Sequence, residues 1–208
     1  MMHIDVVSDF VCPWCFIGLR RLEAALAQAC AQGVVPRVSW HPYFLNPHTP
    51  PAGEPYRAFM ERKFGSAAAV EALHARVAAA ASGDGIGFRF GEMPVRPSTR
   101  LAHGVVAALQ AAGQDVGGLV PAVFSAHFLE LRNIGDPDVL ASLVEAAGLP
   151  TDVVAELARA PADITALTHF ADALRLDGVP AFVFDRRQAV LGAQPAGVLL
   201  ACMTDPPA

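Results

Sequence analysis

The chain has little charge, few basic clusters and only four cysteines, and each shortage excludes a class of protein. Charged residues make up 17% of its 208 residues and hydrophobic residues 53%, a balance that excludes a disordered chain. The formal net charge is −5, and the basic residues are nearly all arginine and scattered. Because no basic block is present to hold a phosphate backbone, we expect no nucleic-acid partner.

A secretory signal and an uninterrupted apolar run are also missing. The first five residues, Met1 to Asp5, lack the cationic start and the apolar stretch of a signal peptide. The most apolar long stretch, residues 101–120, is interrupted by four polar residues, which argues against a membrane span. We therefore expect a cytoplasmic protein with no membrane partner.

Four cysteines are too few for a disulfide scaffold in a chain of this length. Cys12 and Cys15 form a close pair, whereas Cys30 and Cys202 stand alone in helical patterns. A close pair in a reducing compartment is more often redox-active or metal-binding than structural. Zinc needs about four ligands, and the sequence has neither a second close cysteine pair nor a histidine pair at short spacing. We therefore expect no metal. Cys30 and Cys202 are expected to be small helix-face residues, with a regulatory disulfide between them as the alternative.

Apolar spacing predicts strands near both ends of the chain and helices between them. The first unit is a strand at 4–8, a helix at 16–32 and a strand at 37–45, forming a parallel β-α-β unit. The last unit is a hairpin of strands 181–184 and 189–192 followed by a helix at 196–203. Helices between these units are predicted at 55–64, 67–81, 99–112, 119–131, 137–147 and 151–160, with Ser98, Asp136 and Thr151 as N-caps.

This order predicts an α/β chain with a thioredoxin-like fold (β-α-β, then β-β-α) and a large all-helical insertion. Residues 1–50 and 177–208 would form the discontinuous thioredoxin-like domain. Residues 51–176 would form the helical insertion domain.

The Cys12-Pro13-Trp14-Cys15 motif lies where the first predicted strand gives way to the first predicted helix. Unpaired N–H groups and the helix dipole at that point stabilise a thiolate on Cys12. Cys15 lies one turn further along the same face, from which it can attack a mixed disulfide on Cys12. Pro13 suits the first helical position because it has no N–H that needs a partner. We expect Trp14 to be partly exposed and to offer its ring to a thiol substrate.

Far along the chain, Val179-Pro180 directly precedes the predicted strand 181–184. Proline cannot donate a hydrogen bond to a sheet, so its place just before a strand is informative. From position alone, an ordinary trans bond and a cis bond that exposes the Val179 backbone are equally acceptable.

These motifs resemble the DsbA-like thioredoxin family, and in particular its FrnE-type branch. The matching segments cover essentially the whole chain: Ser8 to Gly18, His41 to Pro47, Ala102-His103, Phe124 to Phe128, Gly178 to Phe184 and Gly192 to Pro195. The resemblance implies a thioredoxin domain with a helical insertion, and a cis-proline loop at Val179-Pro180 beside the cysteines. It implies a thiol–disulfide oxidoreductase in which Cys12 and Cys15 exchange electrons with protein or small-molecule thiols, with no cofactor beyond their own disulfide.

Glutathione-dependent enzymes of the same superfamily give the alternative function. They are the 2-hydroxychromene-2-carboxylate isomerases and the kappa-class glutathione transferases, which typically carry serine at the place of Cys12 and lack the second cysteine. Both cysteines here favour redox exchange, for which glutathione is a possible co-substrate. Asn46 and Gln194 match positions near the glutathione thiol in those relatives, so they are candidates for thiol-substrate binding or for turn stabilisation.

The remaining candidates carry two readings each. Asp9 precedes Cys12 by three residues and is expected either to relay a proton to Cys15 or to cap the turn or helix. His103 and His127 stand singly on apolar helix faces and are expected to be satisfied core residues. Trp14 carries no charge, so the Cys12 disulfide should be less oxidising than in relatives with histidine there. We expect a monomer or a homodimer.

Overall fold

A computed structural model of the chain describes residues 2–205; residue 1 and residues 206–208, at the ends of the predicted thioredoxin-like domain, lie outside the described residues. A four-stranded mixed sheet forms its centre, in the order β2-β1-β5-β6. β1 (His3–Ser8) pairs in parallel with β2 (Arg37–Pro42) and antiparallel with β5 (Ala181–Phe184). β6 (Gln188–Leu191) pairs antiparallel with β5. The predicted α/β, thioredoxin-like fold is confirmed, with segments from both ends of the chain in one sheet.

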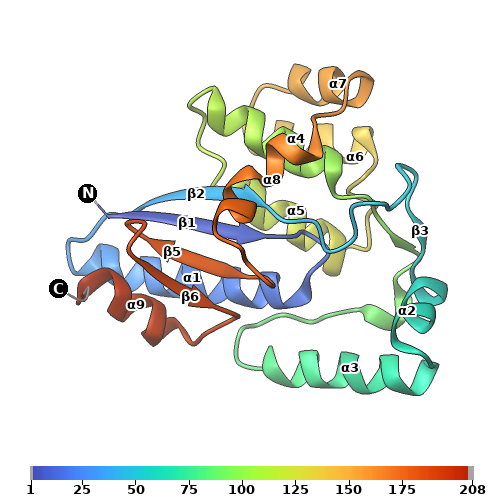
Figure 1. Cartoon of the computed structure of the whole chain (residues 1–208), viewed down its shortest axis with the longest axis horizontal. Coiled ribbons are helices and arrows are strands. Elements are labelled where there is room, and N and C mark those ends of the chain that lie inside the picture. The colour runs from blue at the N-terminus through green and yellow to red at the C-terminus, as the bar shows by residue number, and fades with distance from the viewer. Residues whose placement is uncertain (1, 206–208) are drawn as a thin grey trace.

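Helices cover both faces of this sheet. In Figure 1, α1 (Pro13–Ala31) and α9 (Ala196–Thr204) lie together on one side of the sheet, and α4 (Arg100–Ala111) and α8 (Ile164–Ala173) lie on the other. The other helices are α2 (Tyr56–Phe64), α3 (Ala67–Ala80), α5 (Leu119–Phe128), α6 (Pro137–Ala146) and α7 (Asp152–Arg159). Short elements complete the set: β3 (Glu54–Pro55) pairs with β4 (Val95–Arg96), and η1 (Phe90–Glu92) is a 3-10 turn.

Helix α1 presents the cysteine motif because of the residues at its start. Pro13 is the first helical residue, and Cys12 before it has the extended backbone of an N-cap. The helix therefore begins three residues earlier than the apolar spacing predicts, since that spacing starts only at Phe16. Along its length, α1 buries one face that includes Phe16, Ile17 and Leu22, which fixes the motif against the sheet.

The predicted N-cap positions are confirmed for Asp136 and Thr151 and wrong for Ser98. Asp136 caps α6 by accepting the Asp138 N–H at 2.9 Å. Thr151 precedes α7, but its backbone is already helical and its side chain makes no cap hydrogen bond. Before α4 the cap position belongs to Thr99 instead of Ser98, and its side chain also makes no cap bond. Position in the sequence identifies a cap candidate, but the backbone angle decides whether its oxygen reaches the helix.

Two predicted elements are shorter than expected, and one helix was not predicted as a separate segment. The second strand ends at Pro42 instead of continuing to residue 45. Helix α5 ends at Phe128, and Leu131 just beyond it has a positive φ of 60°, which no helix accommodates. Helix α8 is an addition to the predicted segments.

On the β2 edge of the sheet, a side chain pairs with the backbone of one residue, Trp40. The amide of Gln110, on α4, accepts the Trp40 N–H at 2.8 Å and donates to the Trp40 carbonyl at 2.8 Å. A glutamine thus pairs with both backbone groups that a neighbouring strand would otherwise take. Within residues 2–205, no helix is long and apolar enough to cross a membrane.

Candidate active site

The two motif cysteines lie at the start of α1 as free thiols. Cys12 is the N-cap, and the Cys15 N–H donates to the Cys12 carbonyl at 3.0 Å, closing the first helical turn. Cys12 is 5% exposed and Cys15 is 2% exposed, so Cys12 is the one that lines a cavity. The order of the motif along the helix thus separates an outer thiol from an inner one.

The inner thiol is held in its protonated form. Burial, followed by the hydrogen bond and charge of Cys12, raises the pKa of the Cys15 thiol well above its ordinary value. A thiolate and not a thiol attacks disulfides. Cys15 therefore needs a proton acceptor before it can attack a sulfur on Cys12.

The loop before β5 lies against the cysteines. The Val179–Pro180 peptide bond is cis, and the Val179 carbonyl lies 3.9 Å from the Cys12 sulfur. Pro180 also packs closely on α1, because a β-carbon built at Gly18 would lie 3.0 Å from Pro180 Cγ and 3.0 Å from Phe182 Cζ. The two halves of the predicted site, 167 residues apart in the chain, thus meet at one place.

Asp9 is buried beneath the motif. Its Oδ2 accepts the Leu45 N–H at 2.8 Å, and its Oδ1 lies 3.3 Å from His103 Nε2. Its carbonyl accepts the Cys12 N–H at 3.0 Å. The carboxylate makes no cap bond to α1, so Asp9 does not cap that helix, and the part of the capping interpretation that concerns the helix is wrong. His103 is buried with a polar partner, as expected of a satisfied core histidine.

The other two sequence candidates separate in space. Asn46 lines the cavity beside Cys12, where its Oδ1 accepts a hydrogen bond from Lys63 Nζ at 3.1 Å. Gln194 is not among the lining residues of that cavity, and its Nε2 donates to the Leu191 carbonyl at 2.9 Å across a turn. Trp14 is half-buried and lines the cavity.

The cavity beside Cys12 has a volume of about 320 Å³. Cys12, Trp14 and Val179 form its floor, and side chains of α2, α3, η1 and α5 form the rest of its wall. Four polar wall residues were not found in the sequence, since they come from α2, α3 and β4, which only the fold brings beside Cys12: Tyr56, Lys63, His74 and Arg96.

Ionic contacts fix the cationic wall of the cavity. Arg96 is buried and donates through Nη1 to Glu54 Oε1 at 2.9 Å and to Thr49 Oγ1 at 2.6 Å. Its guanidinium carbon also lies 4.0 Å from the ring centre of Phe59, a cation–π contact. Burial lowers the pKa of Arg96, but an arginine remains charged at neutral pH. The cavity therefore has a fixed positive charge on one side.

Two histidines face the same cavity. His74 Nε2 lies 2.9 Å from the Tyr56 hydroxyl, and its ring stacks on Phe90 at 4.3 Å. His127 is buried, and burial lowers its pKa to about 3, so its imidazole is neutral at physiological pH. Burial also lowers the pKa of His74. The wall near these rings is thus uncharged.

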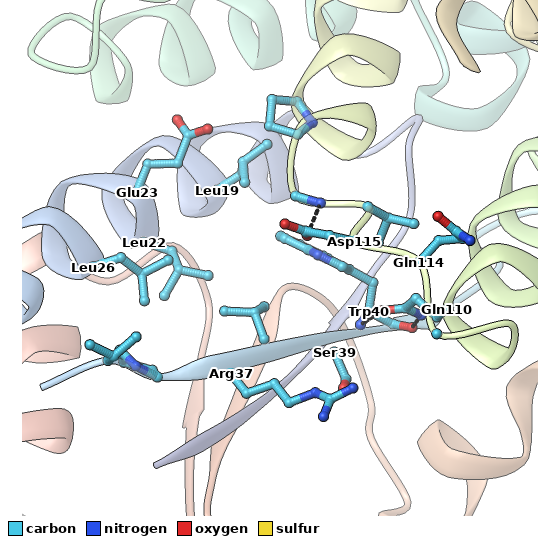
Figure 2. A pocket seen from close by; sticks show the side chains of 17 residues that line it. Leu19, Leu22, Glu23, Leu26, Arg37, Ser39, Trp40, Gln110, Gln114 and Asp115 are labelled. Carbon is cyan, nitrogen blue, oxygen red and sulfur yellow. Dashed lines mark hydrogen bonds between the residues drawn. The ribbon is translucent and has the colours of Figure 1, made fainter. Parts of the chain in front are cut away.

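A second cavity, of about 540 Å³, lies between α1 and the β2 edge and has no cysteine in its wall. Figure 2 shows Leu22 and Leu26 of α1 on one side and Trp40 with Gln110 on another. The loop after α4 closes it, where Asp115 Oδ1 accepts the Gly117 N–H at 2.9 Å. Because it shares no lining residue with the cavity beside Cys12, this cavity is separate from the cysteine site.

Comparison with known proteins agrees with this geometry. The DSBA-like thioredoxin domain family matches residues 3–201. The uncharacterized protein YwbO of Bacillus subtilis is 30% identical over 154 residues, which cover 71% of this chain and 67% of that protein.

Among solved structures, a probable DsbA oxidoreductase (SCO1869) from Streptomyces coelicolor is 28% identical. The match covers 99% of this chain and 90% of that one with a TM-score of 0.85. The cytosolic disulfide reductase DsbM from Pseudomonas aeruginosa with GSH is 20% identical, covers 98% and 93%, and has a TM-score of 0.60, which shows the shared fold. On the family match and the cysteine motif that it contains, the chain belongs to the DsbA-like thioredoxin family.

Proposed function

We propose that the protein is a thiol–disulfide oxidoreductase whose reacting groups are Cys12 and Cys15. The observation that carries this proposal is the first turn of α1. There the outer thiol, Cys12, lies at the N-cap and next to the Val179 carbonyl. The inner, protonated thiol, Cys15, follows three residues later. Membership of the DsbA-like family supports the same reaction class.

In the reducing direction, the Cys12 thiolate attacks a substrate disulfide. One substrate sulfur bonds to Cys12, and the other leaves as a thiolate that takes up a proton. Cys15 then loses its proton and attacks the Cys12 sulfur, releasing the second substrate thiolate. The substrate disulfide gains two electrons, and Cys12–Cys15 becomes a disulfide. The oxidising direction reverses each step, and the reduction potentials of the two partners set the direction.

Asp9 is the proposed proton acceptor for Cys15. Its carboxylate is buried, and its negative charge is among the causes that raise the pKa of Cys15. When Cys15 attacks, a proton passed to Asp9 removes one negative charge from a dry site. In this role Asp9 assists resolution of the mixed disulfide and not its formation.

Glutathione-dependent isomerisation is the competing function. Asn46 supports it, because this residue lines the cavity at the place expected for thiol binding. Cys12 opposes it, since the isomerases typically carry serine there and no resolving cysteine.

The deciding experiment measures disulfide reduction by the reduced wild type and by Cys12→Ser and Cys15→Ser. We expect Cys12→Ser to abolish exchange and Cys15→Ser to form the mixed disulfide but not to release it. Cys30→Ser is the matched control, since Cys30 is a free, exposed cysteine on the same helix. A wild type without exchange activity would exclude the proposal, and glutathione-dependent isomerisation by Cys12→Ser would favour the competing function.

A further inference from the structure

One of the cationic residues that line the cysteine cavity is of a type found only once in this chain. Lys63 is its only lysine, and the other fourteen basic residues are arginines. Lys63 lies in the last turn of α2 and lines both the 320 Å³ cavity beside Cys12 and an adjoining cavity of about 490 Å³. Its ammonium donates to Asn46 and lies 5.5 Å from the ring centre of Phe59 and 6.0 Å from that of Phe64.

The ammonium of Lys63 has no anionic partner in the part of the chain that the structure describes. No carboxylate oxygen of residues 2–205 forms a salt bridge with it, whereas Glu54 is shared by Arg96 and Arg62, at 2.9 and 2.7 Å. The remaining nearby carboxylate, Asp9, has both oxygens directed to other groups. Arg62, Arg96 and Lys63 thus have a single carboxylate, that of Glu54, among the residues that line the two cavities. Burial together with the charge of Arg96 lowers the pKa of Lys63.

The opposite side of the smaller cavity is apolar. Met60, Leu73, Val77, Phe90 and Phe128 line it. Its 320 Å³ lie at the lower end of the range for small-molecule sites, about 300–1,000 Å³. This wall excludes water and favours a flat or branched apolar group close to the Cys12 sulfur.

We propose that the substrate which Cys12 attacks is a small organic disulfide, with an apolar, ring-sized body and one carboxylate-like anionic group that pairs with Lys63. The proposal rests on the proposed function and specifies its substrate. The apolar body would pack against the apolar wall of the cavity. The anionic group would form an ion pair with the Lys63 ammonium, which has no carboxylate partner in the described part of the protein. An extended peptide fits less well, because α2 and α3 cover Cys12 and leave it 5% exposed.

The proposed reaction transfers two electrons from the Cys12–Cys15 dithiol to the small disulfide. The Cys12 thiolate forms a bond to one sulfur of the disulfide while the sulfur–sulfur bond breaks, and the leaving thiolate is protonated by water. Cys15 then displaces the second thiolate. Each turnover thus releases two small thiols and oxidises one Cys12–Cys15 dithiol.

The test compares two aromatic disulfides, one anionic and one uncharged, and reads only how the ratio of their rates changes between variants. 5,5′-Dithiobis(2-nitrobenzoate) carries a carboxylate on each ring, and 4,4′-dithiodipyridine is uncharged at neutral pH. Rates of thiol release are measured for reduced wild type, Lys63→Met, Lys63→Arg and Arg57→Met. Arg57 is the matched control, because it is a basic residue on the same helix whose side chain is 81% exposed and does not line the cavity.

We expect Lys63→Met to lower the rate ratio, anionic over uncharged reagent, by about three- to fivefold, the upper part of the range for an ion pair open to solvent. Lys63→Arg and Arg57→Met should keep the ratio within about twofold of wild type. A changed reactivity of Cys12 alone would alter both rates together and leave the ratio constant. An unchanged ratio in Lys63→Met, or an equal fall in Arg57→Met, would overturn the inference while leaving disulfide exchange intact.

A binding measurement does not depend on the redox reaction. Protection of Cys12 from iodoacetamide is measured with three probes. 2-Naphthoate has a ring and an anion, 2-naphthalenemethanol has the ring alone, and acetate has the anion alone. We expect 2-naphthoate to protect best and to lose this advantage in Lys63→Met. Equal protection by 2-naphthalenemethanol, which has the ring alone, would contradict the proposal. So would the absence of protection by all three probes combined with a faster reaction of an extended peptide disulfide. If the wild type reduces neither reagent yet is protected by naphthoate, the proposed function fails and the binding site stands.

Discussion

Gly18 is where the fit between the helix and the proline loop is tested most directly. It lies inside α1, one turn after the cysteine motif, and faces Pro180 and Phe182. In Gly18→Ala the new β-carbon would lie 3.0 Å from an atom of each, closer than packed carbons normally approach. The loop that carries the Val179 carbonyl must therefore move away from α1 by a few tenths of an ångström.

Two opposing effects set the size of the change in stability. Overpacking of a tight contact costs about 1–3 kcal/mol, and replacing glycine by alanine inside a helix gains about 1 kcal/mol. We therefore expect Gly18→Ala to lower the free energy of unfolding by about 0–2 kcal/mol in urea denaturation. Gly197→Ala is the control, because Gly197 lies in α9 with no atom within 4 Å of its added β-carbon, so this variant should be as stable as wild type or more stable.

The same displacement should slow disulfide exchange, since the loop forms part of the wall around Cys12. We expect a lower rate of aryl disulfide reduction in Gly18→Ala and an unchanged rate in Gly197→Ala. If Gly18→Ala gains stability to the same extent as the control and reduces disulfides at the wild-type rate, the close packing of Pro180 on α1 does not position the site.

Two other predictions concern titratable groups. The pKa of His127 is lowered to about 3 in the folded state from 6.5, so below pH 6.5 the unfolded chain takes up a proton that the folded chain does not. Between pH 7.5 and pH 5.0, urea denaturation should show wild type losing about 2 kcal/mol more stability than His127→Gln, and equal losses would refute the neutral, buried imidazole. In the second, iodoacetamide at pH 8 should modify Cys12 before Cys15 in a reduced Cys30→Ser background, because burial raises the pKa of Cys15. Mass spectrometry that finds Cys15 modified first would reverse the proposed roles of the two thiols.

The sequence was sufficient for the elements that local patterns specify. The strand before Cys12, the proline at the first helical position and the hairpin after Val179-Pro180 all follow from short-range signals, and the structure has each of them. Asp136 was also recognised correctly, because a helix cap is a local arrangement.

The residues that form the wall of the cavity could not be predicted from local sequence patterns. Lys63, His74 and Arg96 belong to α2, α3 and β4, and nothing in their own neighbourhoods relates them to Cys12. Helix packing brings them together, and packing depends on contacts between residues far apart in the chain. The lone lysine was the one compositional signal that distinguished them. The division into residues 1–50 with 177–208 and residues 51–176 stays a prediction.

The glutamine that pairs with Trp40 also determines how two copies of this sheet can meet. With the β2 edge occupied by Gln110, the unpaired backbone of the sheet is at β6, where Leu191 is 57% exposed. Joining at β6 would use the same edge of both copies and so close on itself after two molecules. At the opposite edge the Gln110 amide takes the Trp40 backbone groups, so a strand adding there would first have to displace it.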